Sequence, residues 1–254
     1  MASDPGALPI PDPKRHESKR VAQMFGSIAP SYDLLNHLLS LNVDRLWRRA
    51  AVKSLAPEPG GFYLDLCTGT GDLAFSLLKR VPARVLGVDF SGPMLDLARE
   101  KARRRGASGF CPARGDAMCL PLRAASVDGA MVAFGVRNFE NLERGLGEMA
   151  RVLRSGGRAV ILEFSEPRGR LFGAVYRWYF RALLPRIGRL VSGSSGAYAY
   201  LPASVEAFPD AEALAGLFDG AGFEVLRQRP LTGGIATLHI LRRTATGSPG
   251  GGGA

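Results

Sequence analysis

The sequence is poor in the residues that build metal centres and disulfide frameworks. Its 254 residues include only three cysteines and three histidines. The cysteines, Cys67, Cys111 and Cys119, lack metal-ligand spacing and fall in or near predicted strands. We therefore expect buried free thiols in a reducing cytoplasm and no metal site.

Long apolar runs and a recognisable targeting segment are lacking as well. No uncharged apolar stretch reaches the roughly 18 residues that a membrane-spanning helix needs. Residues 1–20 are polar, Pro-rich and charged, unlike a signal peptide. We expect a cytoplasmic protein with a disordered N-terminus over 1–14 and a flexible Gly-rich tail over 244–254.

Acidic residues are in the minority. Asp and Glu number 23 against 33 Lys and Arg, which gives a formal net charge of +10. A charge of this sign suits nucleic acid, an anionic membrane surface or an acidic substrate. Because the sequence has no zinc knuckle, no basic aromatic RNA-binding pattern and no helix-turn-helix spacing, we do not expect a nucleic-acid partner.

What the chain does contain is a regular alternation of strand and helix patterns, which predicts an α/β fold with a doubly wound parallel sheet. Ser155–Gly157 is expected to end the third helix before the fifth strand. His239, in the last strand, is expected to be structural. The predicted strands are 61–66, 83–89, 109–114, 127–134, 158–164, 223–229 and 235–242, and the predicted helices are 72–80, 93–105, 140–153 and 209–221.

Two segments depart from this alternation within a single expected domain, 15–243. A helical front piece over 15–56 carries a leucine stripe and is expected to cover the functional site. An insert over 165–205 is rich in aromatic residues and arginine. It fits a helix packed on the core, a lid over an apolar substrate or an amphipathic element lying on a membrane.

The first strand leads directly into a Gly-rich turn. Asp65 lies in the apolar run before it, and Gly69 and Gly71 form the turn itself. Ligands of open α/β sheets bind beyond the carboxyl ends of the strands, and glycine lets the backbone turn tightly there. The turn lacks the third glycine of the dinucleotide fingerprint.

Two further acidic residues follow later strands. Asp89 lies 18 residues after Gly71 and suits the two hydroxyls of a ribose. Asp116, beside Ala117 and Met118, suits an adenine amino group. Asp65 would oppose a pyrophosphate but could pair with the ammonium group of S-adenosylmethionine, which favours a methyltransferase over a dehydrogenase. The alternative is that these acids only cap helices and turns.

The chain closely resembles the C-methyltransferases of menaquinone and ubiquinone biosynthesis, the MenG/UbiE/COQ5 family, over nearly all of its ordered length. The blocks that carry the resemblance most specifically are Tyr32-Asp33-Leu34-Leu35-Asn36, Phe134-Gly135-Val136-Arg137-Asn138 and Tyr198-Ala199-Tyr200-Leu201. The resemblance implies a Rossmann-like class I methyltransferase dependent on S-adenosylmethionine, with seven strands of which the last is antiparallel.

The resemblance also implies site residues. Thr70, Asp89 and the Asp116–Ala117 pair match the family's cofactor motifs. Arg137 and Asn138 follow the fourth strand and are expected to face the reacting centre. Arg137 would stabilise a phenolate or hold a water that takes its proton, and Asn138 would orient a ring oxygen. The alternative for Arg137 is a structural ion pair.

We therefore expect methyl transfer from S-adenosylmethionine to a ring carbon of a polyprenylated quinol, with demethylmenaquinol preferred. The alternatives are the benzoquinol of ubiquinone biosynthesis, both substrates, another lipophilic acceptor, or a non-catalytic cofactor-binding scaffold. Since the prenyl tail lies in a bilayer, a peripheral association with the inner face of the membrane is expected. A homodimer is a further expectation.

Overall fold

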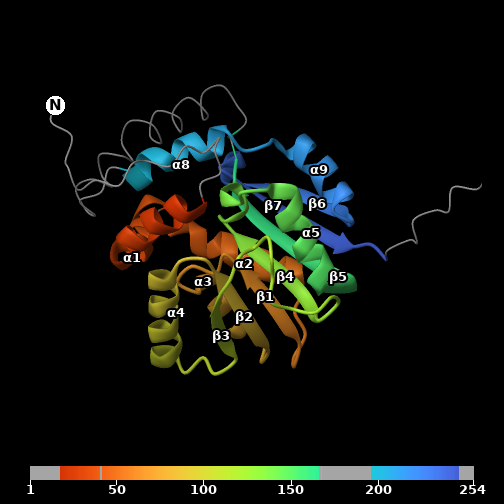
Figure 1. Ribbon diagram of the computed structural model, residues 1–254, viewed down its shortest axis with the longest axis horizontal. Coiled ribbons are helices and arrows are strands. Elements are labelled where there is room, and N and C mark those ends of the chain that lie inside the picture. The colour runs from red at the N-terminus through yellow and green to blue at the C-terminus, as the bar shows by residue number, and fades with distance from the viewer. Residues whose placement is uncertain (1–17, 41, 166, 168–195, 246–254) are drawn as a thin grey trace, which may run out of the picture.

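The computed structural model describes residues 18–40, 42–165, 167 and 196–245 (Figure 1). The N-terminus that was predicted to be disordered lies outside these residues. So do most of the predicted insert, 165–205, and most of the Gly-rich tail.

The described elements follow the predicted alternation closely. The strands are β1 (Phe62–Leu66), β2 (Arg84–Asp89), β3 (Phe110–Arg114), β4 (Val127–Ala133), β5 (Leu153–Phe164), β6 (Phe223–Leu231) and β7 (Ala236–Arg243). The helices are α1 (Ser18–Leu39), α2 (Val43–Leu55), α3 (Asp72–Leu78), α4 (Gly92–Arg105), α5 (Leu142–Val152), α8 (Gly196–Glu206) and α9 (Ala211–Gly220). Two 3₁₀ segments, η1 (Val136–Asn138) and η3 (Thr232–Gly234), connect them.

All seven strands form one sheet in the order β3-β2-β1-β4-β5-β7-β6. The pairs from β3 through to β5 are parallel, whereas β7 runs antiparallel to both β5 and β6. The seven-stranded sheet with an antiparallel last strand is therefore confirmed. The chain reverses direction across the sheet between β1 and β4, and this is where an open α/β sheet opens a crevice.

Helices cover both faces of the sheet because successive strand side chains point to opposite faces. Tyr63 and Met131 pack with α2 and α3 on one face. Their neighbours Leu64 and Val132 pack with α5 and α9 on the other face. Each face of the central strands is apolar, as expected for strands buried on both sides.

Helices α1 and α8 form a separate cover at one end of the sheet, where they lie side by side (Figure 1). Val21, Met24 and Ile28 of α1 are buried and pack with Tyr200 of α8. This small apolar cluster joins the front of the chain to a segment that follows the fifth strand. Helices α1 and α8, which are far apart in the sequence, are thereby held together over the carboxyl edge of the sheet.

The boundary between α5 and β5 differs from the prediction. The helix ends at Val152 and the strand begins at once at Leu153, so Ser155–Gly157 lies inside β5 instead of before it. Gly156 has φ +74°, and the pairing with β4 shifts register between Val127 and Gly129. The glycines therefore form an irregularity within the strand, which is their common role inside sheets.

The prediction of buried cysteines is wrong for two of the three. All three are free, but Cys111 and Cys119 are exposed and Cys67 is half-buried. Cys111 belongs to β3, the edge strand of the sheet, whose outer side chains meet solvent. Cys119 lies in the turn after β3. A strand pattern in the sequence does not distinguish an edge strand from a central one.

Burial lowers the pKa of His239, in the middle of β7, to about 4. Its ring lies edge-on to Phe218, and its Nδ1 has no hydrogen-bond partner within the described residues. The unfolded chain, with a histidine pKa of about 6.5, binds more protons than the folded one between these values. The free energy of unfolding therefore decreases, through His239, as the pH falls from roughly 6.5 to roughly 4.

We expect the variant His239→Leu to gain stability relative to the wild type as the pH falls, by about 2 to 3 kcal/mol between about pH 7.5 and about pH 4.5. Urea denaturation at both pH values measures it. The variant and the wild type are compared at each pH, because both contain Asp65. Burial raises the pKa of Asp65 to about 7, and this changes the free energy of unfolding with pH in the opposite direction. A difference that does not change with pH would contradict the assignment.

Candidate functional site

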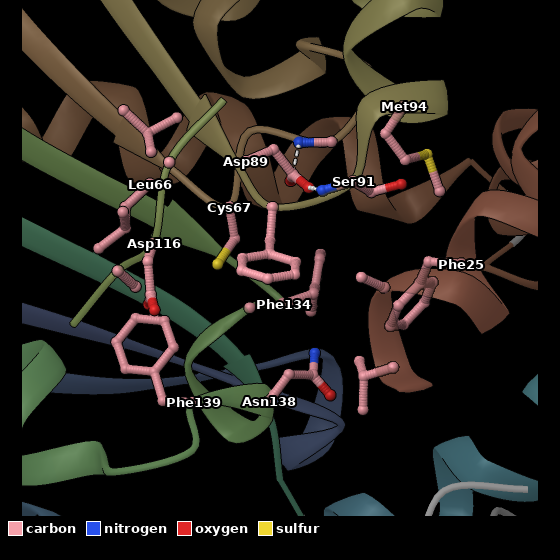
Figure 2. Close-up of a pocket in the computed structure, with 18 of the residues that line it drawn as sticks. Phe25, Leu66, Cys67, Asp89, Ser91, Met94, Asp116, Phe134, Asn138 and Phe139 are labelled. Carbon is pink, nitrogen blue, oxygen red and sulfur yellow. Dashed lines mark hydrogen bonds between the residues drawn. The ribbon is translucent and has the colours of Figure 1, made fainter. Parts of the chain in front are cut away.

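A cleft of about 800 Å³, open to solvent, lies at the switch point of the sheet (Figure 2). Its walls come from the carboxyl ends of three parallel strands: Leu66 at the end of β1 with Cys67 after it, Asp89 at the end of β2, and Phe134 after β4. Val21, Ala22, Phe25 and Tyr32 of α1 close one side of it. The cleft thus lies between the sheet and the cover helix.

The two central strands end in strained backbone. Cys67 follows β1 with φ +54°, and Phe134 follows β4 with φ +59°. Neither is glycine, and a non-glycine residue in this left-handed region costs on the order of 1 to 3 kcal/mol. Both line the cleft. This backbone conformation turns each loop sharply away from its strand and leaves the strand ends open to a ligand.

Asp65 does not line the cleft in the described structure. Its side chain is 1% exposed and lies beneath the Gly-rich turn. One carboxylate oxygen accepts from Thr68 Oγ1 at 2.6 Å and from the backbone N–H of Ala74 at 3.1 Å. Burial raises the pKa of Asp65 to about 7, and these two hydrogen bonds oppose the rise. Asp65 therefore braces the turn and the start of α3 from below.

Asp89 lies in the cleft and is held rigidly. One oxygen accepts the backbone N–H of Gly69 and the other accepts that of Ser91, both at 2.8 Å. Burial raises the pKa of Asp89, while hydrogen bonds from the backbone N–H groups of Ser91, Gly69 and Phe90 oppose the rise. The carboxylate still has acceptor capacity to offer a ligand.

Asp116 and Ala117 also line the cleft, together with Met118. The Asp116 carboxylate accepts the backbone N–H of Met118 at 2.9 Å. This is an Asx turn, in which the side chain fixes its own loop. The capping interpretation of this acid is therefore correct in part, but the residue also faces the cleft.

Thr70 belongs to a polar cluster that holds α1 onto the Gly-rich turn, instead of lining the cleft. Its hydroxyl donates to Asp33 of α1 at 2.7 Å and accepts from Lys101 of α4 at 2.8 Å. Lys101 also forms ion pairs with Asp33 and, at 3.0 Å, with Asp72. We call Asp33, Thr70, Asp72 and Lys101 the latch.

Arg137 turns away from the cleft. It forms an ion pair with Glu163 of β5 at 2.7 Å, and the two side chains are 4% and 1% exposed. It also donates to the carbonyl of Phe134 at 2.6 Å and to Ser204 of α8 at 3.3 Å. This is the structural ion pair that the sequence left open as the alternative for Arg137.

Asn138, the next residue, does line the cleft. Tyr200 of α8 donates its hydroxyl to the amide Oδ1 of Asn138 at 3.0 Å. Tyr200 is itself 3% exposed and lies behind Asn138, outside the cleft wall. Burial raises the pKa of Tyr200, the charge of Arg137 lowers it by less, and the charge of Glu163 adds to the rise. The phenol is therefore protonated and remains a donor at neutral pH.

The structure thus brings part of the predicted site together. The predicted residues that line the cleft are Gly69, Asp89, Asp116, Ala117 and Asn138, and those that do not are Asp65, Thr70, Gly71 and Arg137. The sequence analysis did not single out the apolar wall or the residues behind it, which include Phe25, Ser91, Met94, Phe139, Lys101 and Glu163. The resembling blocks that contain Asp33 and Tyr200 carried a signal for the helices that cover the cleft.

The two glycines of the turn provide a matched test of the backbone. Gly69 has φ +54° and Gly71 has φ +87°, so alanine is strained at both. A Cβ on Gly71 would lie 2.8 Å from the ring of Phe75 and 3.3 Å from that of Phe110, whereas a Cβ on Gly69 would meet nothing within 4 Å.

We expect Gly69→Ala to lower the free energy of unfolding by about 1 kcal/mol and Gly71→Ala by about 2 to 4 kcal/mol, since only the second adds overpacking to the strain. Urea denaturation of both variants measures the difference. Equal losses would show that the packing around Gly71 does not matter.

The latch makes a prediction about the cover helix. In Asp33→Ala, Lys101 and Thr70 lose their partner on α1. The lost interactions stabilise the docked helix by about 1 to 2 kcal/mol. We expect hydrogen exchange of the α1 amides to speed up about ten-fold, while exchange in the sheet stays unchanged.

Asp96→Ala is the matched control, because Asp96 pairs with Arg99 on the exposed face of α4, where the Asp96 side chain is 75% exposed. If Asp96→Ala frees α1 as much as Asp33→Ala does, the latch has no specific role.

Comparison with known proteins gives close relatives of this chain. A demethylmenaquinone methyltransferase of Deinococcus radiodurans is 51% identical over 91% of this chain and 95% of its own length. A protein of Geotalea uraniireducens named ubiquinone/menaquinone biosynthesis C-methyltransferase UbiE is 44% identical over 88% of this chain and 96% of its own length.

Solved structures share the fold at low identity. The cyclase SpnF superposes with a TM-score of 0.69 at 17% identity, over 94% of this chain and 99% of its own. A SAM-dependent methyltransferase from Aquifex aeolicus superposes with a TM-score of 0.58 at 18% identity, over 77% and 88%. The predicted fold class is confirmed. Residues 14–243 match the model of the ubiE/COQ5 methyltransferase family, and the chain belongs to that family.

Proposed function

We propose that this protein transfers a methyl group from S-adenosylmethionine to a ring carbon of demethylmenaquinol, a polyprenylated naphthoquinol. The observation that carries the proposal is the likeness to the Deinococcus relative, which is named for that activity and is matched over nearly its whole length. The family supplies methyl transfer as the type of reaction. The cleft at the ends of β1, β2 and β4 supplies a place for both reactants.

The cleft residues fit S-adenosylmethionine. Gly69 offers bare backbone with free space in front of it. Asp89 offers lone pairs for the two ribose hydroxyls. Next to it, the buried hydroxyl of Ser91 has no hydrogen-bond partner within the part of the chain that is described. Asp116 offers an acceptor for the adenine amino group, and Met118 an apolar surface for the ring.

Asp65 is not assigned to the ammonium group of the cofactor. Its carboxylate is buried and already accepts from Thr68 and Ala74. It acts on the cofactor through the shape of the Gly-rich turn that it supports.

The chain contributes alignment of the reactants and exclusion of water. When bound, S-adenosylmethionine supplies a sulfonium methyl group, which passes to the ring carbon as the carbon–sulfur bond breaks and the ring gives up its proton. Phe25 and Tyr32 of α1 cover the cleft, and the latch at Asp33 holds that helix in place. Fixing two reactants in line is worth about 7 to 11 kcal/mol in well-oriented systems.

Asn138 provides the polar contact to a ring oxygen of the quinol. It lines the same cleft as Asp89. Arg137 supports it from behind, because its charge is neutralised by Glu163 and its other donors hold the carbonyl of Phe134 and Ser204. In this proposal Arg137 positions η1 and does not touch the quinol.

The benzoquinol of ubiquinone biosynthesis is the second candidate substrate. The observation that favours it is the Geotalea relative, whose name includes both quinones. Both substrates share a ring oxygen next to the reacting carbon, so the contact with Asn138 serves either of them.

A location at the membrane surface follows from the substrate, because a polyprenyl tail is strongly apolar. No helix in the described residues is long and apolar enough to cross a bilayer. Helix α2 presents Leu46, which is 57% exposed, between the exposed residues Arg45 and Arg49. Such a surface, on a chain of net charge +10, supports peripheral binding to anionic lipid.

The test is a methyl-transfer assay with labelled S-adenosylmethionine, in which demethylmenaquinol and the demethylated benzoquinol are offered side by side in vesicles. We expect label in the naphthoquinol product. Label only in the benzoquinol would favour the second candidate, and label in both would mark a dual enzyme. Binding of the cofactor with no labelled product would refute quinol methylation.

Asp89→Ala is the matched negative variant, with Asp96→Ala as its surface control. We expect Asp89→Ala to weaken cofactor binding at least about ten-fold, since it removes two charge-assisted hydrogen bonds to the ribose. Isothermal calorimetry separates this loss from any loss of quinol binding.

A further inference from the structure

We infer that Tyr200 is a positioning residue that sets the polarity of the Asn138 amide, so that the cleft presents an N–H donor to the quinol oxygen and favours its ionised form. The inference rests on the proposed function and deepens it. It names the chemical state in which the substrate is held and a residue, remote from the cleft wall, that determines this state.

The first step concerns the amide itself. An asparagine side chain has one acceptor end and one donor end, and the two are exchanged by a half-turn. Tyr200 donates to Oδ1, so the donor end, Nδ2, points the other way. Figure 2 shows the amide nitrogen of Asn138 turned into the cleft toward Phe134 and the amide oxygen turned away.

The second step concerns the donor that fixes this orientation. The phenol of Tyr200 is buried, and burial raises its pKa, so it keeps its proton. After a half-turn Nδ2 could donate to the phenol oxygen, but the buried phenol O–H would lose Oδ1, the acceptor that it has within the described residues, and this makes the half-turn unfavourable. The phenol of Tyr200 therefore acts as a lock on the amide.

The third step concerns what the cleft offers a ligand. Apart from its backbone N–H bond to the carbonyl of Gly135, Asn138 has one hydrogen bond in the described structure, the bond from Tyr200. Its Nδ2 is left for the ligand. Aromatic side chains line the same cleft, among them Phe25 and Phe139. In such surroundings a single directed donor has a large electrostatic effect.

The fourth step concerns the substrate. A neutral quinol hydroxyl is best held by an acceptor, whereas a quinolate oxygen is best held by a donor. The ring carbon next to a quinolate is the stronger nucleophile. Presenting Nδ2 lowers the pKa of the bound quinol, and presenting Oδ1 would raise it. Tyr200 thus favours the reactive form of the substrate without touching it.

The test is the pH profile of Tyr200→Phe, a change that removes one oxygen and keeps the ring in its packing. We expect kcat to fall about ten-fold at neutral pH with little change in the dissociation constant of the cofactor. We also expect the acid limb of kcat to move up by about one pH unit, because the bound quinol becomes harder to ionise. The rate should recover toward that of the wild type at high pH.

Ser204→Ala is the matched control. Ser204 lies one turn further along α8, is equally buried and bonds to Arg137, so its loss weakens the same contact between α8 and η1 without touching Asn138. Its acid limb should stay at the pH of the wild type. A uniform loss of rate in Tyr200→Phe, with no movement of the limb, would reduce Tyr200 to a packing residue and overturn the inference.

Two variants of Asn138 test the polarity independently of how well Tyr200→Phe folds. Asn138→Asp keeps the acceptor for Tyr200 but presents an anionic oxygen to the cleft, so it should be slower than Asn138→Ala. In the Asn138→Ala background, Tyr200→Phe should have no further effect. If Asn138→Asp is as active as Asn138→Ala or more so, the donor role fails.

A measurement without turnover completes the design. A short-chain prenylated naphthoquinol is titrated by absorbance in the complex with S-adenosylhomocysteine. Its pKa should be lower when bound to the wild type than when bound to Tyr200→Phe. If the wild type neither binds nor methylates a quinol, the proposed function fails and this inference falls with it. If the wild type methylates the quinol but the two pKa values agree, only the inference fails.

Discussion

The arrangement of the cleft depends on one buried ion pair, between Arg137 of η1 and Glu163 of β5. Removing two charges from water costs several kcal/mol for each ion, so such a pair persists only when its remaining polar groups are satisfied. Here they are, because Arg137 also holds the carbonyl of Phe134 and the hydroxyl of Ser204. The pair fixes η1 against the sheet and α8 against η1. That anchoring also fixes the position of Asn138, the residue after Arg137, in the cleft.

The cover of the cleft is held from two directions. On one side, the latch joins Asp33 of α1 to Thr70 of the Gly-rich turn and to Lys101 of α4. On the other side, Tyr200 and Ser204 join α8 to η1. The two helices also pack on each other through a small apolar cluster. Loosening either anchor would therefore loosen the cover and admit more water to the cleft, although neither set of residues lies in its wall.

The sequence predicts the edge of the sheet at which the site forms, but not which side chains face it. Asp89 and Asp116, which were predicted to bind the cofactor, both line the cleft, because a residue near the carboxyl end of a parallel strand lies close to the crevice. Arg137 and Asn138 were expected to act together. They are consecutive in a 3₁₀ turn, where neighbouring side chains point about 120° apart, so only one can face the ligand. Thr70 was misplaced for a different reason: its partner Asp33 lies 37 residues away.

The sheet alone does not determine the reaction. The cyclase SpnF shares this fold over almost the whole chain at low identity, and it is named for a different chemistry. What the two structures have in common is the fold, and in this chain its switch point presents glycine backbone and strand-end acids to a ligand. The specific chemistry comes from the second half of the cleft, which α1, η1 and α8 build. In the function that we propose, a single amide there, held in one of its two orientations, decides whether the site favours a phenol or a phenolate. A ring carbon becomes a good nucleophile only in the second case, so the hydrogen bond behind Asn138 belongs to the reaction as much as the residues that touch the substrate.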